Sequence, residues 1–128
     1  MSIRLLFNAS AIVEILIGLA LLLAPALVIG LLLGDGISSP GVAVARVAGV
    51  GLLSLGVAGW QSPGNDTRLA QRAGLCIYNI GAVVVLTTFG SLSETGGIIL
   101  WPTVVLHGLI AAMMLPALAS NQRNEREN

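Results

Sequence analysis

The sequence predicts an all-α integral membrane protein whose single domain is a bundle of four transmembrane helices. The chain of 128 residues is 55% hydrophobic and only 9% charged, whereas a soluble domain carries about 25% charged residues. Its apolar residues fall into four segments, and the last three each have about the 20 residues that one crossing of the hydrocarbon core requires. We expect spans at residues 4–24 with an extension at 26–33, and at 42–60, 69–90 and 98–119, within a domain of residues 1–120.

The first apolar segment is longer than one crossing needs, because it runs from Ile3 to Leu33 and contains Pro25. Proline removes a helical hydrogen bond, so we expect it to kink this long helix or to divide a spanning part from a shorter segment near the interface. A cleaved signal peptide is the competing interpretation, because the sequence APA around this proline resembles a cleavage site. The apolar run before it exceeds the usual length of about 7–15 residues in such peptides, which favours a retained membrane helix.

Small residues recur in the second and third segments at spacings that favour close helix packing. In lipid, where apolar burial does not drive helices together, small residues let helix backbones approach one another. We expect these positions to pack tightly within the bundle, and an interface between subunits is the alternative. The positions are Gly41, Ala45 and Gly49, at successive steps of four, together with Gly51, Gly56, Gly74 and Gly81.

The arginines predict the orientation of the chain. All six bases are arginines, and five of them lie before the first segment, at the start of the third or after the fourth. The other two connections, GDGISSPG and GSLSETGG, contain no base, so the positive-inside rule predicts that both termini are cytoplasmic. Trp60 then marks the inner interface and Trp101 the outer one. We expect residues 121–128 to form a polar, solvated tail.

Each of the four predicted spans carries one strongly polar residue at a similar depth. Glu14 and Asn79 lie about 15 Å from the start of their segments, and His107 reaches the midplane from the opposite side. Arg46 lies nearer the outer face, but its long side chain can extend to the depth of Glu14. An ionised side chain at the centre of a membrane helix costs about 2.5–3.5 kcal/mol, so we expect an ion pair of Glu14 with Arg46. The candidate ligand-binding cluster consists of Glu14, Arg46, Tyr78, Asn79 and His107.

Each of these residues also has a purely structural explanation. Arg46 can extend outward to the lipid head groups instead of inward. Glu14 can be neutral and form only an interhelical hydrogen bond, which is also a common role of an asparagine such as Asn79 in a membrane helix. His107, alone on an apolar helix face, can be a packed and hydrogen-bonded histidine. The sequence leaves these alternatives open.

Composition disfavours several classes of function. The sequence contains no basic patch that would indicate nucleic-acid binding. Its single cysteine, Cys76, excludes an internal disulfide. One histidine, one membrane-buried glutamate and no cysteine pair fall short of a tetrahedral metal site, so we expect neither a metal nor a cofactor. No serine or cysteine is placed beside the only histidine to act as a nucleophile. Enzyme activity is therefore not expected, although a role as a subunit of a membrane-bound enzyme stays open.

Two family resemblances bear on function. The stretches VARVAGVGLLSLGVAGW, YNIGAVVVL and GIILWPTVVLHGLIAAMML are similar to small bacterial four-helix membrane proteins, loosely of the DoxX-like kind. This resemblance implies the bacterial inner membrane and, in some members, quinone-linked redox partners, but no catalytic motif. The stretch AIVEILIG, which contains Glu14, resembles the first helix of small multidrug resistance transporters. That resemblance implies a dimer whose glutamate exchanges protons for cationic drugs, although Arg46 would repel a cation.

Two hypotheses follow from these observations. The first is a non-enzymatic protein of the lipid bilayer that binds a small amphipathic molecule, such as a quinone or a lipid, or that docks against a larger membrane complex. The second is a proton-coupled small-molecule transporter, acting as a homodimer, in which Glu14 is the titrating carboxyl.

Overall fold

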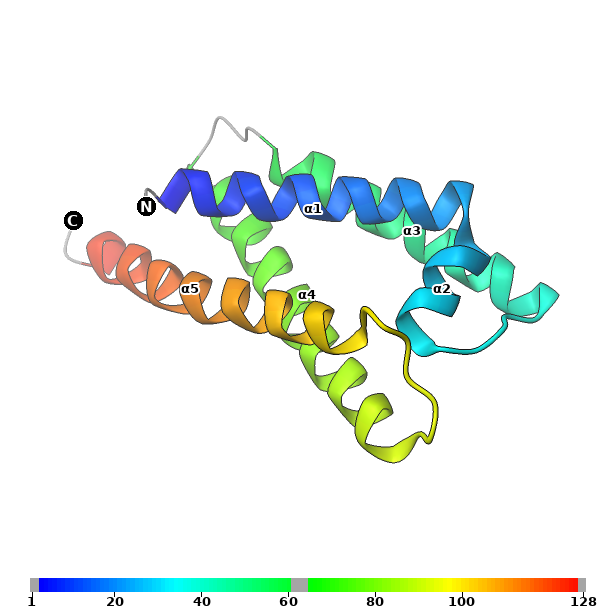
Figure 1. Cartoon of the computed structure of the whole chain (residues 1–128). Helices are drawn as coiled ribbons and strands as arrows, with labels where there is room; N and C mark the ends of the chain where they lie inside the picture. The colour runs from blue at the N-terminus through cyan, green and yellow to red at the C-terminus, as the bar shows by residue number, and fades with distance from the viewer. Residues whose placement is uncertain (1–2, 61–64, 127–128) are drawn as a thin grey trace.

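The computed structural model confirms the all-α class. It describes the backbone of residues 3–60 and 65–126 and the side chains of residues 5–60 and 70–116. Over these residues the chain forms five helices (Figure 1). They are α1 (Ile3–Leu23), α2 (Pro25–Leu33), α3 (Ser39–Gly59), α4 (Asn65–Leu92) and α5 (Leu100–Arg126).

Three of the described helices are long and apolar enough to cross a membrane. These stretches are Leu5–Leu23 in α1, Ser39–Gly59 in α3 and Ala70–Leu92 in α4, and α5 contains a shorter apolar stretch, Leu100–Pro116. Large apolar side chains also face outward along these helices, and Val47 and Ile77 are each more than two-thirds exposed. Extended apolar surface of this kind indicates contact with lipid instead of water, so the chain is a membrane protein.

Pro25 divides the first apolar segment into two helices. The helix α1 ends at Leu23, and Ala24 leaves the helical conformation, with φ of −137° and ψ of 56°. Pro25 is the first residue of α2, a position where its missing N–H breaks no helical hydrogen bond. Of the two expectations for this proline, the structure shows the division and not a kink within one continuous helix.

The helices pack as two antiparallel pairs. α1 packs chiefly against α3, and α4 packs chiefly against α5. In Figure 1, α1 and α3 lie side by side, whereas α4 runs obliquely to both and its C-terminal end lies away from them. The α4–α5 pair is therefore a unit that meets the α1–α3 pair through both α4 and α5.

Glycines bring the backbones of α1 and α3 into direct contact. A Cβ atom added at Gly49 would lie 2.8 Å from the carbonyl oxygen of Gly18, and one at Gly18 would lie 2.8 Å from the carbonyl oxygen of Gly49. A Cβ atom at Gly56 would lie 2.7 Å from the carbonyl oxygen of Ala11. Close packing at small residues thus occurs at two of the expected positions. It does not occur at Gly51 or Gly81, where an added Cβ atom meets nothing within 4 Å.

The two base-free connections meet at one end of the molecule. Gly34 caps α2 in the left-handed conformation, with φ of 80°, and its N–H donates to the carbonyl of Gly30. The last carbonyls of α2 accept hydrogen bonds from the α4–α5 connection: Gly97 donates to Leu32 at 3.1 Å, and Ile99 donates to Leu31 at 3.2 Å. Helix carbonyls that would otherwise lack partners are satisfied in this way, and α2 is tied to the start of α5.

Replacing Gly97 by alanine is expected to separate these two connections. The added Cβ atom would overlap the carbonyl group of Leu31, so the loop must move and the two hydrogen bonds to α2 must lengthen. We expect a loss of about 1–2 kcal/mol of unfolding free energy, because each such bond contributes about 0.5–1.5 kcal/mol. Gly36→Ala is the matched control, since nothing lies within 4 Å of its added Cβ atom. Equal unfolding curves for the two variants in detergent would contradict this expectation.

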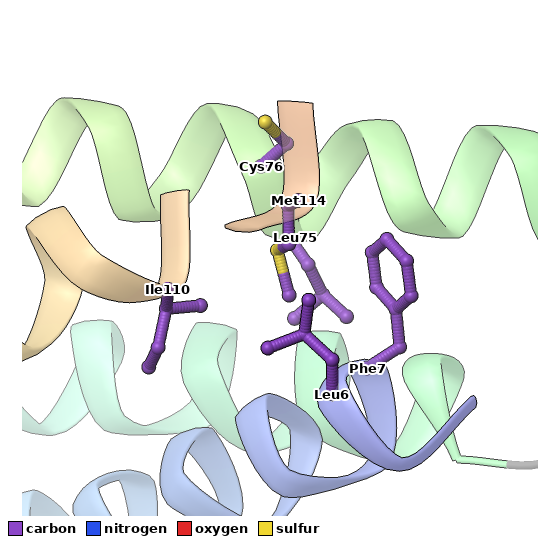
Figure 2. Close-up of a cluster of buried hydrophobic side chains, with 6 residues drawn as sticks. All are labelled: Leu6, Phe7, Leu75, Cys76, Ile110 and Met114. Carbon is purple, nitrogen blue, oxygen red and sulfur yellow. The ribbon is translucent and has the colours of Figure 1, made fainter. Parts of the chain in front are cut away.

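Two clusters of buried apolar side chains hold the helices together. The first joins the start of α1 to α4 and α5, and Figure 2 shows Leu6, Leu75 and Met114 pointing toward one another. Its members are Leu6, Phe7, Leu75, Cys76, Ile110 and Met114. The second joins α1 to α3 through Leu21, Ala45 and Leu52. A layer of buried polar residues lies beside the first cluster. On α1 this layer lies between the two clusters, and on α4 and α5 it lies next to the first cluster.

Candidate functional site

Four polar side chains are buried in this layer. Ser10 and Glu14 come from α1, Asn79 from α4 and His107 from α5, and none is more than 2% exposed. Three of the four belong to the cluster predicted from the sequence. Ser10 was not predicted as a site residue, although it lies one helical turn before Glu14 and so shares its face of α1. That spacing is the signal that identifies it.

Asn79 is the centre of the hydrogen-bond network. Its Nδ2 donates to the backbone carbonyl of Leu75 at 2.8 Å and to Oγ of Ser10 at 3.4 Å. Its Oδ1 lies 2.8 Å from Nδ1 of His107. One amide side chain therefore links α4 to α1 on one side and to α5 on the other.

The orientation of Asn79 fixes the tautomer of His107. A backbone carbonyl only accepts, so the atom facing Leu75 must be the amide nitrogen, and Oδ1 must face the histidine. Since Oδ1 also only accepts, Nδ1 of His107 carries a hydrogen and donates it. In the neutral ring, Nε2 then keeps its lone pair and is the basic nitrogen.

Tyr78, the residue before Asn79 on α4, also contacts the network. Its ring meets the ring of His107 edge to face, with centroids 5.7 Å apart and an interplanar angle of 81°. The half-buried Tyr78 also packs against the second apolar cluster. The structure thus places Tyr78, Asn79 and His107 in contact with one another, and it buries Glu14 one helical turn after Ser10.

Glu14 is the exception within this network. Its side chain is fully buried, and neither Oε1 nor Oε2 has a hydrogen-bond partner among the described residues. Most buried polar atoms in native proteins are hydrogen-bonded, and leaving one without a partner costs about 1–3 kcal/mol. Glu14 is therefore the buried polar side chain of this layer whose oxygens lack partners among the described residues.

The predicted ion pair between Glu14 and Arg46 is not formed. Arg46 is exposed on the outer surface of α3, whereas both carboxyl oxygens of Glu14 are buried without partners. The reason is the register of α3, whose buried residues are Ala45, Gly49, Leu52 and Gly56. Arg46 follows Ala45 by one residue, which rotates it about 100° around the helix and out of the interface. Arg46 is therefore not part of the site.

An apolar groove of about 590 Å³ lies outside the polar layer. It is lined by Ile12, Ile15 and Leu16 of α1 and by Val57 and Trp60 of α3. Ile12 and Leu16 lie about 160° and 200° around α1 from Glu14, on the opposite side of the helix. The groove is therefore separate from the carboxyl. Among the residues whose side chains are described, no three His, Cys, Asp or Glu residues gather as metal ligands.

Comparison with known proteins identified no relative of this chain. No protein-family model matches the chain, and neither the curated proteins nor the solved structures give a significant match.

Proposed function

We propose that this chain is a non-enzymatic, multi-pass protein of the bacterial inner membrane that binds a small amphipathic molecule, such as a quinone or a lipid, through its polar cluster. The observation that carries the proposal is Glu14, whose two carboxyl oxygens are buried without hydrogen-bond partners among the described residues. A polar head group bound to this carboxyl would remove the cost of burying its oxygens without hydrogen-bond partners. The apolar tail of the ligand would lie among the helices and the lipid. A polar group from another subunit of a membrane complex would serve the same purpose.

We infer that α1, α3, α4 and α5 each cross the membrane, with both termini in the cytoplasm. The start of α1 and the end of α5 lie at one end of the molecule, and the base-free connections meet at the other (Figure 1), which supports this topology. The apolar stretch Leu100–Pro116 of α5 would extend about 25 Å at 1.5 Å per residue. Slight thinning of the bilayer would accommodate that length.

The lengths of the hydrogen bonds indicate how a ligand would reach Glu14. The bond from Asn79 to Ser10 is 3.4 Å long, whereas the distance between Asn79 and His107 is 2.8 Å. The weakest polar link of the cluster therefore lies between the α1–α3 pair and the α4–α5 pair. Separation of the two pairs would expose Glu14 and leave the Asn79–His107 contact intact.

Replacing Glu14 by glutamine tests the binding function. We expect saturable binding of a short-chain benzoquinone or of spin-labelled phosphatidylglycerol by the wild-type protein in nanodiscs. Loss of the carboxyl should weaken binding about tenfold, which corresponds to about 1.4 kcal/mol. Glu94→Gln is the matched control, because it makes the same chemical change at an exposed position of the α4–α5 connection. Equal affinity of the wild type and Glu14→Gln, or binding of neither probe, would contradict the proposal.

A second candidate function is proton-coupled transport of a small molecule by a homodimer. The buried and unpaired carboxyl of Glu14 favours it, because a titrating group in a membrane span must be able to gain and lose a proton. In proteoliposomes, a pH gradient should then drive uptake of the bound probe by the wild type but not by Glu14→Gln. Binding that depends on Glu14, without any response to the gradient, would favour the binding protein over the transporter.

A further inference from the structure

We propose that the outward face of the α1–α3 pair binds an anionic phospholipid, whose phosphate pairs with Arg46 and whose acyl chain runs along α3 to the apolar groove at Trp60. This site goes beyond the proposed function, because the groove lies on the opposite side of α1 from Glu14. It also gives a role to Arg46, which the polar cluster does not use.

The arginine and the groove lie on one face of α3. Val50 and Val57 follow Arg46 by four and eleven residues, which places them about 40° and 20° around the helix from it. Trp60 lies about 40° from Arg46 in the other direction. All four residues are exposed. Since Val57 and Trp60 line the groove, the exposed face that carries Arg46 continues into it.

The neighbouring side of α1 supplies the second wall of this surface. Ile12 and Leu16 line the groove together with residues of α3. Leu19 and Leu23 continue the same stripe at steps of three and four residues, and all four side chains are exposed. The C-terminal half of α1 lies beside the N-terminal half of α3 (Figure 1), so this apolar stripe extends from the groove toward the level of Arg46.

Arg46 is a cation without an acidic partner on this apolar face. It lies about 10 Å from the start of α3, within the stretch Ser39–Gly59 that is apolar enough to cross a membrane. The acids whose side chains are described are Glu14, Asp35 and Glu94, and none of them forms an ion pair with Arg46. A charge in a membrane span is costly unless it reaches a partner, so this guanidinium is expected to reach an anion among the lipid head groups.

A phospholipid complements the site in geometry as well as in charge. The guanidinium presents a planar fork of N–H donors that can form two parallel hydrogen bonds with one phosphate. Val57 lies about 17 Å from Arg46 along the axis of α3. One leaflet contributes about 15 Å to the hydrocarbon core, so an acyl chain that starts near the level of Arg46 ends at the groove.

A second copy of the chain fits this face less well. A symmetric dimer places the same surface of both copies against each other. Two subunits inserted in the same orientation would therefore bring their Arg46 side chains to one level of the membrane. The described residues of the face include no acid that could lie between the two cations. Repulsion between the arginines thus favours lipid as the occupant.

Quenching of tryptophan fluorescence by brominated lipids tests the site. The chain contains two tryptophans, so Trp101→Phe leaves Trp60 as the reporter in the groove. In phosphatidylcholine bilayers, phosphatidylglycerol brominated near its chain ends should associate with this face about fivefold more strongly than the matched brominated phosphatidylcholine. Arg46→Gln should reduce this preference to less than about 1.5-fold, whereas Arg46→Lys, which keeps the charge, should retain more than about twofold.

Glu14→Gln separates this site from the polar cluster. In the same Trp101→Phe background it should leave the lipid preference at Trp60 unchanged. If the preference fell in Glu14→Gln but not in Arg46→Gln, the lipid would belong to the polar cluster, and this proposal would fail while the proposed function stood. Equal association of the two lipids with the protein that retains Arg46 would overturn the proposal. Quenching by neither lipid would also overturn it, because protein would then cover the face.

Discussion

Gly49→Ala is expected to lower the unfolding free energy by about 2–3 kcal/mol. The added Cβ atom would lie 2.8 Å from the carbonyl oxygen of Gly18 and 3.2 Å from the backbone nitrogen of Leu22. These neighbours are backbone atoms of α1, so a rotamer change cannot relieve the overlap and the two helices must move apart. Since α1 and α3 form the most extensive helix pair, the change also loosens the layer that contains Glu14.

Gly51→Ala is the matched control for this substitution. It lies two residues further along the same helix, and nothing lies within 4 Å of its added Cβ atom. We expect its stability to stay within about 0.5 kcal/mol of the wild type. The two variants should be compared by unfolding in mixed detergent micelles, with circular dichroism as the measure of remaining helix. If Gly49→Ala were as stable as Gly51→Ala, the close contact between α1 and α3 would be refuted.

Asn79→Leu is expected to cost about 2–4 kcal/mol and to release the tautomer of His107. The variant loses the hydrogen bonds to Ser10 and His107, and interhelical hydrogen bonds in membrane proteins contribute about 0.6 kcal/mol each. It also leaves the buried Nδ1–H of His107 without its acceptor, at an additional cost of about 1–3 kcal/mol. The orphaned donor therefore accounts for about half or more of the expected loss.

The spectroscopic consequence of Asn79→Leu separates this mechanism from a general loss of packing. With Oδ1 absent, the neutral ring of His107 should become a mixture of Nδ1–H and Nε2–H forms, visible in its ¹⁵N spectrum. Thr88→Val is the control, because Thr88 is exposed on the same helix and its hydroxyl bonds only to the carbonyl of Val84. A single unchanged tautomer in Asn79→Leu would show that Asn79 does not orient the histidine.

The sequence by itself predicted the membrane environment and much of the candidate site. Runs of apolar residues long enough for a crossing require helices, because backbone polar groups have no other partners in lipid. Polar residues within such runs are expensive, so Glu14, Asn79 and His107 could be identified as interior residues from depth alone, and they are buried. The division at Pro25 was one of the two outcomes expected from the missing N–H of proline.

The tertiary structure alone decided which polar residues meet. Depth gives the level of a side chain but not its direction, and a difference of one residue rotates it about 100°. The contacts of α1 with Gly49 and Gly56 set the rotation of α3, and that rotation turns Arg46 outward and leaves Glu14 unpaired. Packing of α4 against α5 then brings Asn79 to His107. Rotation about each helix axis depends on contacts between helices distant in the sequence, which no single helix encodes.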